Sequence, residues 1–251
     1  DEANGRLLAA VAPQLTDCTL SPARFADLKD RLLRELAAFD TVDAYIAVRE
    51  TRRALLREFH ATPADMLPVA RDLTLAEVQA FARSLFARGK LEALAYGNLG
   101  PDQAAAAVRR VASVLGTQPV ADAELLRPRQ RVDRAGEDLR SSQQLQVNNS
   151  TLRREYRLGD DDAQARAIAH VLSAVVGDPF YSEMRTRQQL GYIVQAAAFE
   201  DERSTLAMFL IQSGEYPADE LERRAEAFIG TLPRQLADLS PEAWATIVAG
   251  V

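Results

Sequence analysis

Apolar residues recur every three or four positions through much of residues 20–115, which is the spacing of amphipathic helices. One helix is predicted to begin after Ser21-Pro22, because serine caps a helix and proline suits its first turn. The apolar stripe of that helix comprises Phe25, Leu28, Leu32, Leu36 and Phe39. Further helices are predicted over about 43–59, from a capping box at 74–77 to about 89, and over 101–115. Residues 91–96 are predicted to form a short strand, and residues 97–100 a turn.

The pattern breaks between about residues 117 and 136, where Pro119, Pro128 and scattered charges are typical of a linker. We therefore divide the chain into a mostly helical domain at 1–118, a linker at 119–136 and a second domain at 137–251. At 251 residues the chain is long enough for two domains, since a domain usually has about 100–200 residues.

Period-two alternation opens the second domain: Leu152, Tyr156 and Leu158 alternate with charged residues and predict a half-buried strand. The acidic run at 160–162 predicts a helix start, and Asp178-Pro179 predicts a second helix that runs to Leu190. A hairpin follows at 192–199 and 205–212, and then a long helix at 217–239 that bends at Pro233. The predicted fold class is α+β, with two domains in which helices cover one face of an antiparallel sheet.

Composition removes several function classes. The net charge is −6 and no segment concentrates Lys and Arg, so we expect no nucleic-acid partner. No apolar run approaches the roughly 20 residues that span a bilayer, so we expect no membrane association. A single cysteine, Cys18, allows no internal disulfide and has no obvious His partner for nucleophilic catalysis.

The chain is predicted to hold no metal site. Catalytic zinc normally takes three protein ligands, and the two histidines, His60 and His170, fall in different predicted domains. His60 is expected in the last turn of a helix, and His170 on the exposed side of another. The aspartates at 160–162 are explained by helix capping, and the turn at 97–100 lacks the residues of a phosphate-binding loop.

Residues 185–194 allow two interpretations. In the structural one they form a helix end, with Leu190 buried, Gly191 at positive φ and Tyr192 starting a strand. That interpretation requires neither Arg185 nor the phenol of Tyr192. In the functional one, the two side chains converge and donate hydrogen bonds to peptide carbonyls or to a developing oxyanion.

Residues 185–194 are also similar to the R-T-x-x-Q-L-G-Y-x-V segment of the insulin-degrading enzyme and pitrilysin family, zinc peptidases with an inverted H-x-x-E-H motif. Residues 91–98 resemble an E-A-L-x-x-G-N element near the end of that family's third domain. Residues 147–149 resemble the start of its fourth domain, and residues 211–213 and 221–228 continue the register. The resemblance implies that 1–118 is part of a third domain and 137–251 a truncated fourth domain.

This resemblance implies a function as well. No H-x-x-E-H occurs here, so zinc would be held by the N-terminal half of the same enzyme. This chain would be the C-terminal portion of a zinc metalloendopeptidase that degrades or processes peptides in an enclosed chamber, inactive alone. Arg185 and Tyr192 would bind the substrate, and the partners would be the N-terminal half and peptides. Because the chain starts at Asp1 without Met and its last helix lacks a stop signal, we expect a fragment.

Three alternatives stay open at this point. The parent could be a precursor-processing peptidase such as the relative in pyrroloquinoline quinone biosynthesis. It could instead be a non-catalytic paralogue that acts as a structural or peptide-binding partner of a zinc-bearing subunit. An unrelated α+β binding module is the third. The compartment, bacterial periplasm or cytoplasm, is not specified by the sequence.

Overall fold

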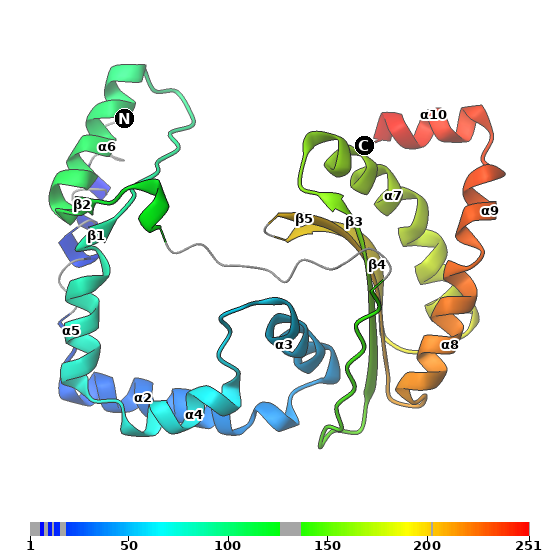
Figure 1. Ribbon diagram of the computed structural model, residues 1–251, viewed down its shortest axis with the longest axis horizontal. Helices are drawn as coiled ribbons and strands as arrows, with labels where there is room; N and C mark the ends of the chain where they lie inside the picture. The colour runs from blue at the N-terminus through cyan, green and yellow to red at the C-terminus, as the bar shows by residue number, and fades with distance from the viewer. Residues whose placement is uncertain are drawn as a thin grey trace. The chain divides into compact units, whose positions relative to one another are not determined.

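A computed structural model describes residues 6–7, 10–11, 13–15, 19–125, 137–201 and 203–250. The chain forms two compact units, one of Asp1–Ala37 with Ala61–Pro128 and one of Ala38–His60 with Arg129–Val251 (Figure 1). The predicted division had placed residues 38–60 with the helical domain, whereas they pack in the second unit. Most of the predicted linker, residues 126–136, lies outside the described residues. The assignment of domains 1–118 and 137–251 to family domains stays a prediction.

The first unit is mostly helical. Lys29, on the helix Pro22–Ala37, donates hydrogen bonds to the carbonyls of Arg71 and Leu73 at 2.6 and 2.7 Å, so it satisfies carbonyls at the end of another helix. The predicted capping box is confirmed, since the Thr74 side chain accepts from the Glu77 amide and Glu77 bonds back. The elements are α2 (Pro22–Ala37), α4 (Pro63–Asp72), α5 (Leu75–Leu85), β1 (Arg88–Gly89), α6 (Pro101–Leu115), β2 (Gln118–Pro119) and the 3-10 turn Asp122–Glu124.

The strand predicted at 91–96 is wrong. Within the described residues of this unit, only β1 and β2 pair, and they are parallel. Leu94 and Tyr96 are each 95% exposed, because no neighbouring strand or helix covers them. Alternation alone does not make a strand, since a strand requires a partner for its backbone hydrogen bonds.

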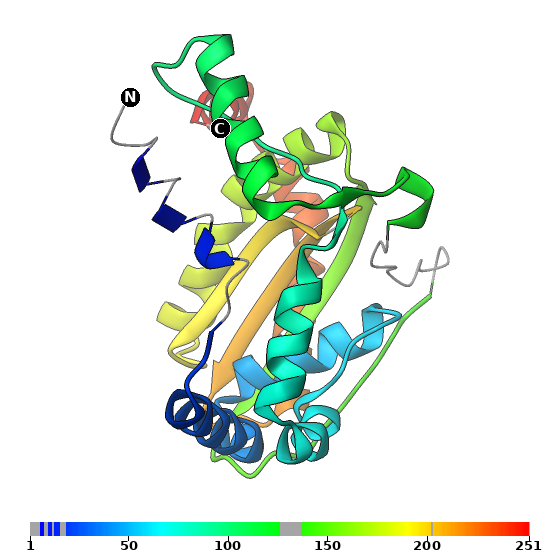
Figure 2. The same cartoon turned by 90° about the vertical axis from the view of Figure 1, so that its left-hand side faces the viewer.

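The second unit is built on a three-stranded antiparallel sheet in the order β3-β5-β4 (Figure 2). Its strands are β3 (Ser150–Asp160), β4 (Ile193–Asp201) and β5 (Ser204–Ser213). The predicted hairpin is therefore confirmed, with Ile193 opposite Gln212 and Asp201 opposite Ser204. The central strand β5 is buried on both faces from Thr205 to Ile211, which matches its continuous apolar sequence.

One face of this sheet carries the main core. Phe180 packs edge-to-face on Phe209 and Phe228, with centroids 5.2 and 5.3 Å apart, and joins helix to sheet. The helices on this face are α7 (Ala163–Tyr181), α8 (Ala218–Ile229) and α9 (Leu232–Ala237), and α10 (Pro241–Gly250) also contacts α7. The α+β class is confirmed in this unit.

The opposite face is covered by α3 (Ala44–Leu56), preceded by the 3-10 turn Phe39–Thr41 (Figure 1). Arg52 of α3 binds the carboxylates of Glu155 and Asp201 at 2.6 and 2.5 Å. Charged residues that alternate along β3 are therefore covered in part by α3, because Glu155 pairs with Arg52. The prediction had helices on one face only, because ion pairs to a distant helix leave no periodic signal.

Two predicted helix boundaries differ from the structure. Pro179 does not start a second helix but lies inside α7, which continues to Tyr181 and passes directly into a π-helical turn. The helix predicted at 217–239 is two helices, since α8 ends at Ile229 and α9 starts at Leu232 with Pro233 in its first turn. Proline suits a first turn because its missing N–H has no partner there anyway.

Candidate functional site

The candidate site is built on the π-helical turn Ser182–Arg187 at the end of α7. Its amide hydrogen bonds reach further back than those of an α-helix: Gln188 donates to Glu183 at 3.0 Å, and Leu190 to Met184 at 2.9 Å. Met184 and Leu190 are 0% and 1% exposed, so the turn is anchored in the core at two points. Single π-turns occur frequently at functional sites, and this one carries Arg185.

The exit from the turn corrects the prediction for Gly191. The positive φ belongs to Gln189, at 53°, and not to Gly191. Glycine is required at 191 for a different reason: a Cβ there would overlap the carbonyl oxygen of Gln212 and lie 2.9 Å from its carbonyl carbon. The chain therefore approaches β5 at a distance that only glycine permits.

Arg185 and Tyr192 lie together. The Arg185 Nη1 donates a hydrogen bond to the backbone carbonyl of Tyr192. Its Cζ is 4.3 Å from the centroid of the Tyr192 ring, which is cation–π distance. The Tyr192 side chain is 81% exposed, so its hydroxyl is available to a ligand. The two side chains converge as expected from the sequence, while substrate binding by them stays a prediction.

A third side chain of this cluster is Tyr181, which the sequence reasoning missed. The Arg185 Cζ is also 5.4 Å from the centroid of the Tyr181 ring. Tyr181 precedes Arg185 by four residues, and side chains at this spacing on a helix are neighbours. The spacing of four residues could have identified Tyr181 from the sequence, but the prediction considered only the helix boundary at 178–179 and not this pair.

Backbone groups of β4 are held by the same helical segment. The amide of Ala198 donates to the Ser173 hydroxyl of α7 at 2.6 Å, and Arg185 binds the carbonyl of Tyr192. Gly177 lies beside the carbonyl of Ala196, where an added Cβ would be 3.5 Å from the oxygen. α7 and the π-turn thus run along β4 and fix the position at which β4 begins.

The other side of the π-turn borders a cavity of about 810 Å³ between this turn and α8 with α9. Gln188 bridges the two walls: its amide donates to Glu183 at 3.0 Å and its carbonyl oxygen accepts from Arg224 at 3.3 Å. Arg224 also binds Glu220 at 2.6 Å. Hydrogen bonds from Arg223 and Arg224 lower the pKa of Glu220 to about 2. This polar network links the π-turn to α8, on the side of the turn that borders the cavity.

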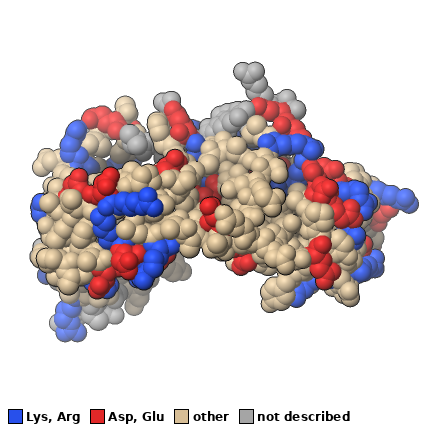
Figure 3. Space-filling view, turned by 90° about the horizontal axis from the view of Figure 1, so that it is seen from below, with Lys and Arg blue, Asp and Glu red and all other residues tan. Residues whose placement is uncertain are grey.

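Charge elsewhere is mixed. On the face drawn in Figure 3, Lys and Arg side chains are interspersed with Asp and Glu.

Asp162 caps α7 by accepting from the Ala165 amide at 2.8 Å, as the sequence predicted for the acidic run. No helix in the described part of the chain is long and apolar enough to cross a membrane.

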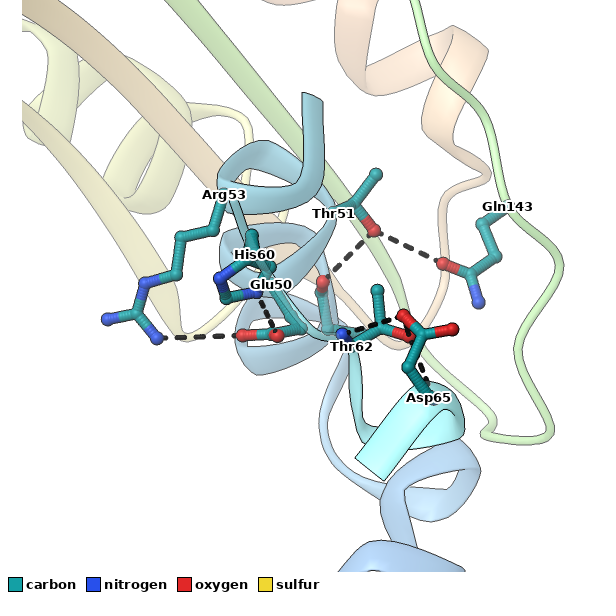
Figure 4. Close-up of polar contacts among 8 residues, drawn as sticks. Glu50, Thr51, Arg53, His60, Thr62, Asp65 and Gln143 are labelled. Atoms are coloured by element: carbon teal, nitrogen blue, oxygen red, sulfur yellow. Dashed lines mark hydrogen bonds and ion pairs between the residues drawn. The ribbon is translucent and has the colours of Figure 1, made fainter. Parts of the chain in front are cut away.

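The histidines lie apart from the Arg185 cluster. His60 is not in the last turn of a helix, since α3 ends at Leu56; its Nε2 lies 2.5 Å from the Glu50 carboxylate, which also pairs with Arg53 (Figure 4). His60 packs in the same unit as His170, which is exposed on α7 as predicted. Among the described residues, no three His, Cys, Asp or Glu side chains form a possible metal site. Cys18 lies outside the described residues.

Comparison with known proteins gives the class of the fold. A family model described as "PQQ synthase PqqF-like, C-terminal lobe domain 4" matches residues 171–251, which include Arg185 and Tyr192. The crystal structure of pitrilysin is similar over 98% of this chain and 26% of its own, with a TM-score of 0.73 and 20% identity. At that identity the likeness shows a shared fold: helices with a small antiparallel sheet.

Sequence relatives agree with this likeness. Human insulin-degrading enzyme is 26% identical over 244 residues, covering 95% of this chain and 24% of the relative. The putative zinc protease mug138 of Schizosaccharomyces pombe is 24% identical over 240 residues, covering 94% and 25%. This chain is homologous to the C-terminal region of the insulin-degrading enzyme and pitrilysin family. It spans about a quarter of the length of these relatives.

Proposed function

We propose that this chain is the C-terminal, non-zinc-bearing portion of a zinc metalloendopeptidase that degrades or processes peptides in an enclosed chamber. The observation that carries the proposal is the pairing of Arg185, on a core-anchored π-turn, with Tyr192, which directly precedes β4. Both residues lie inside the segment that the family model matches. A helix end alone requires neither a guanidinium nor an exposed phenol at these positions.

The chemistry of the pair suits a peptide substrate. The Tyr192 hydroxyl is a hydrogen-bond donor on a largely exposed side chain. A guanidinium has five N–H donors in a fixed plane, and only one of those of Arg185 is bonded to the Tyr192 carbonyl. Both groups are therefore available to donate to a peptide carbonyl, and more strongly to the oxyanion that forms when that carbonyl is attacked.

Zinc does not fit the described residues of this chain, because they bring no three suitable ligands together. In the proposed enzyme the metal would belong to the N-terminal half, where it would polarise the peptide carbonyl and activate water. The partners of this chain are then that N-terminal half and peptide substrates. The contribution of this chain is the binding and orientation of the peptide through Arg185 and Tyr192.

A second candidate is a precursor-processing peptidase of pyrroloquinoline quinone biosynthesis. The observation that favours it is the match of residues 171–251 to the PQQ synthase PqqF-like model. It differs from the first candidate in substrate range: a processing enzyme would cleave one precursor, whereas a degrading enzyme would cleave many unrelated peptides.

The experiment is to assay the 251-residue chain alone and together with its zinc-bearing N-terminal half. We expect the chain alone to retain no stoichiometric zinc after dialysis and to leave quenched-fluorescence peptides intact, and the combination to cleave them in a chelator-sensitive manner. Stoichiometric zinc with cleavage by the chain alone would overturn the proposal. A zinc-loaded combination that binds peptides without cleaving them would indicate the non-catalytic paralogue.

A further inference from the structure

The guanidinium of Arg185 lies within cation–π distance of two tyrosine rings. Its Cζ is 4.3 Å from the ring of Tyr192 and 5.4 Å from the ring of Tyr181. Tyr181 is the last residue of α7 and is 42% exposed, so it is partly covered by protein. Tyr192 lies at the start of β4. One ring precedes the π-turn and the other follows it, just before β4, and both lie against the guanidinium.

Arg185 differs from the other stacked arginines of the second unit. Arg224 lies 4.6 Å from the Tyr216 ring, but its charge is paired with Glu220 at 2.6 Å. Arg52 lies 5.5 Å from the Phe199 ring and is paired with Glu155. Among the described residues, Arg185 forms no ion pair. Its charge is not neutralised by a carboxylate, so its orientation depends on the rings and on the Tyr192 carbonyl.

An arginine held in this way affects the orientation of the groups that it contacts. A free arginine side chain samples many rotamers, and ordering it has an entropic cost at the moment a ligand binds. Here the Tyr181 ring restricts the guanidinium before any ligand arrives. The guanidinium in turn holds the carbonyl of Tyr192 and lies on its ring. Tyr181, Arg185 and Tyr192 therefore form a continuous series of contacts, with the guanidinium between the two rings.

We propose that Tyr181 is a positioning residue of this site: its ring fixes the Arg185 guanidinium and, through it, the orientation of Tyr192 towards a peptide carbonyl. The use of this orientation for substrate rests on the proposed function, whereas the orientation itself is a property of the 251-residue chain. An aromatic face is what the contact requires, and the hydroxyl of Tyr181 is not.

The test is side-chain NMR of the 251-residue chain, with the Arg185 signals assigned from their loss in Arg185→Lys. In the wild type we expect the Arg185 Hδ and Hε signals to be shifted upfield by the rings. Its Hη protons, one of which is donated to the Tyr192 carbonyl, should exchange slowly with water. Both features should persist in Tyr181→Phe. In Tyr181→Leu they should move towards those of the exposed Arg34, and the Tyr192 ring signals should move with them.

A matched control is Ile168→Ala, which removes an apolar side chain that is 52% exposed on the same helix. It should leave the Arg185 and Tyr192 signals in place. Arg185 signals that do not change in Tyr181→Leu would overturn the proposal, and so would equal changes in Tyr181→Phe and Tyr181→Leu.

Kinetics of the combined enzyme separate this proposal from the proposed function. Tyr181→Leu should lower kcat/KM by about tenfold, the scale of one cation–π contact, and Tyr181→Phe should restore it. If the NMR signals behave as expected while neither Tyr181→Leu nor Tyr192→Phe changes cleavage, the positioning is upheld and the peptidase role of the site is rejected. Loss of cleavage without any NMR change rejects the positioning alone.

Discussion

The guanidinium of Arg185 lies on the ring of Tyr192, with 4.3 Å between its Cζ and the ring centroid, and donates a hydrogen bond to the carbonyl of the same residue. Tyr192 follows Arg185 by seven positions in the chain, and Arg185 itself lies within the π-turn. Because each side chain contacts the other, a substitution at one position changes the surroundings of the other. Variants should therefore remove one function at a time.

Tyr192→Phe removes only the hydroxyl and retains the ring beneath Arg185. If the hydroxyl donates mainly to the transition state, kcat and kcat/KM of the combined enzyme should fall together while KM changes little. Loss of one such donor costs about 2.7–4 kcal/mol where it serves an oxyanion. Initial rates of peptide cleavage, measured over a range of peptide concentrations, give these constants.

The matched control for this variant is Tyr96→Phe, at a side chain that is 95% exposed in the first unit. It should retain wild-type kinetics, and neither variant should change the thermal midpoint. Wild-type kinetics in Tyr192→Phe would identify Tyr192 as a packing residue, as would activity lost only through unfolding.

Gly191→Ala should destabilise the second unit strongly. The new methyl group would overlap the carbonyl of Gln212, so either β4 or the π-turn must move. Such overpacking, including the backbone shift it forces, typically costs about 1–3 kcal/mol and occasionally more. Urea unfolding measures it.

Gly177→Ala is the matched control, because its Cβ would be at an ordinary 3.5 Å from the Ala196 carbonyl oxygen and alanine favours the helix. It should be neutral or slightly stabilising. Equal stability of the two alanine variants would contradict the close approach at Gly191.

Local patterns predicted much of this fold, because they record which side of each element is buried. The hairpin of β4 and β5, the capping box at Thr74 and the convergence of Arg185 with Tyr192 all follow from spacing within a few residues. The same reasoning was wrong about Pro179, since proline is typical of a helix start and only the packing of Phe180 shows that α7 continues.

Contacts between distant segments could not be predicted in this way. Gly191 was expected to need a positive φ, whereas its requirement comes from Gln212, more than twenty residues later. Arg153 and Glu155 of β3 were expected on a polar face, yet they lie beneath α3 with Arg52. A charged residue in a strand has the same pattern whether its partner is water or a helix a hundred residues away.

The contact of α3 with the sheet depends on Arg52. Its side chain and those of Glu155 and Asp201 are only 14–15% exposed. In Arg52→Met, Glu155 would retain Arg153 at 2.5 Å and Asp201 would retain Arg57 at 3.7 Å, so both carboxylates would lose a close partner with little water to replace it. Removing one partner of a buried pair costs about 3–5 kcal/mol, and the partial exposure here reduces our expectation to about 2–4 kcal/mol. Urea unfolding of the second unit measures the change.

Two further variants isolate the cause. Arg34→Met breaks a surface pair with Asp30 and should change stability by less than about 0.5 kcal/mol. Arg52→Met combined with Asp201→Leu should recover part of the loss, because the carboxylate that retains only the longer contact, 3.7 Å to Arg57, is then removed. A single Arg52→Met variant as stable as wild type would show that α3 does not depend on this ion pair.

Glu220 should make the second unit sensitive to acid. Its pKa is lowered from 4.5 to about 2 by hydrogen bonds from Arg223 and Arg224. A carboxylate with a lowered pKa in the folded state stabilises that state fully above the unfolded value, and the contribution is lost as pH falls from about 4.5 towards 2. Urea midpoints measured across this window should fall more steeply in the wild type than in Glu220→Gln.

A carbon NMR titration of the Glu220 carboxyl checks the cause of this effect directly. In the wild type the midpoint should lie near 2, and in Arg223→Gln combined with Arg224→Gln it should return towards 4.5, because both hydrogen bonds are then lost. Added salt should weaken the effect, since the pair is open to solvent. A wild-type midpoint near 4.5 would show that the two arginines do not hold Glu220 in solution.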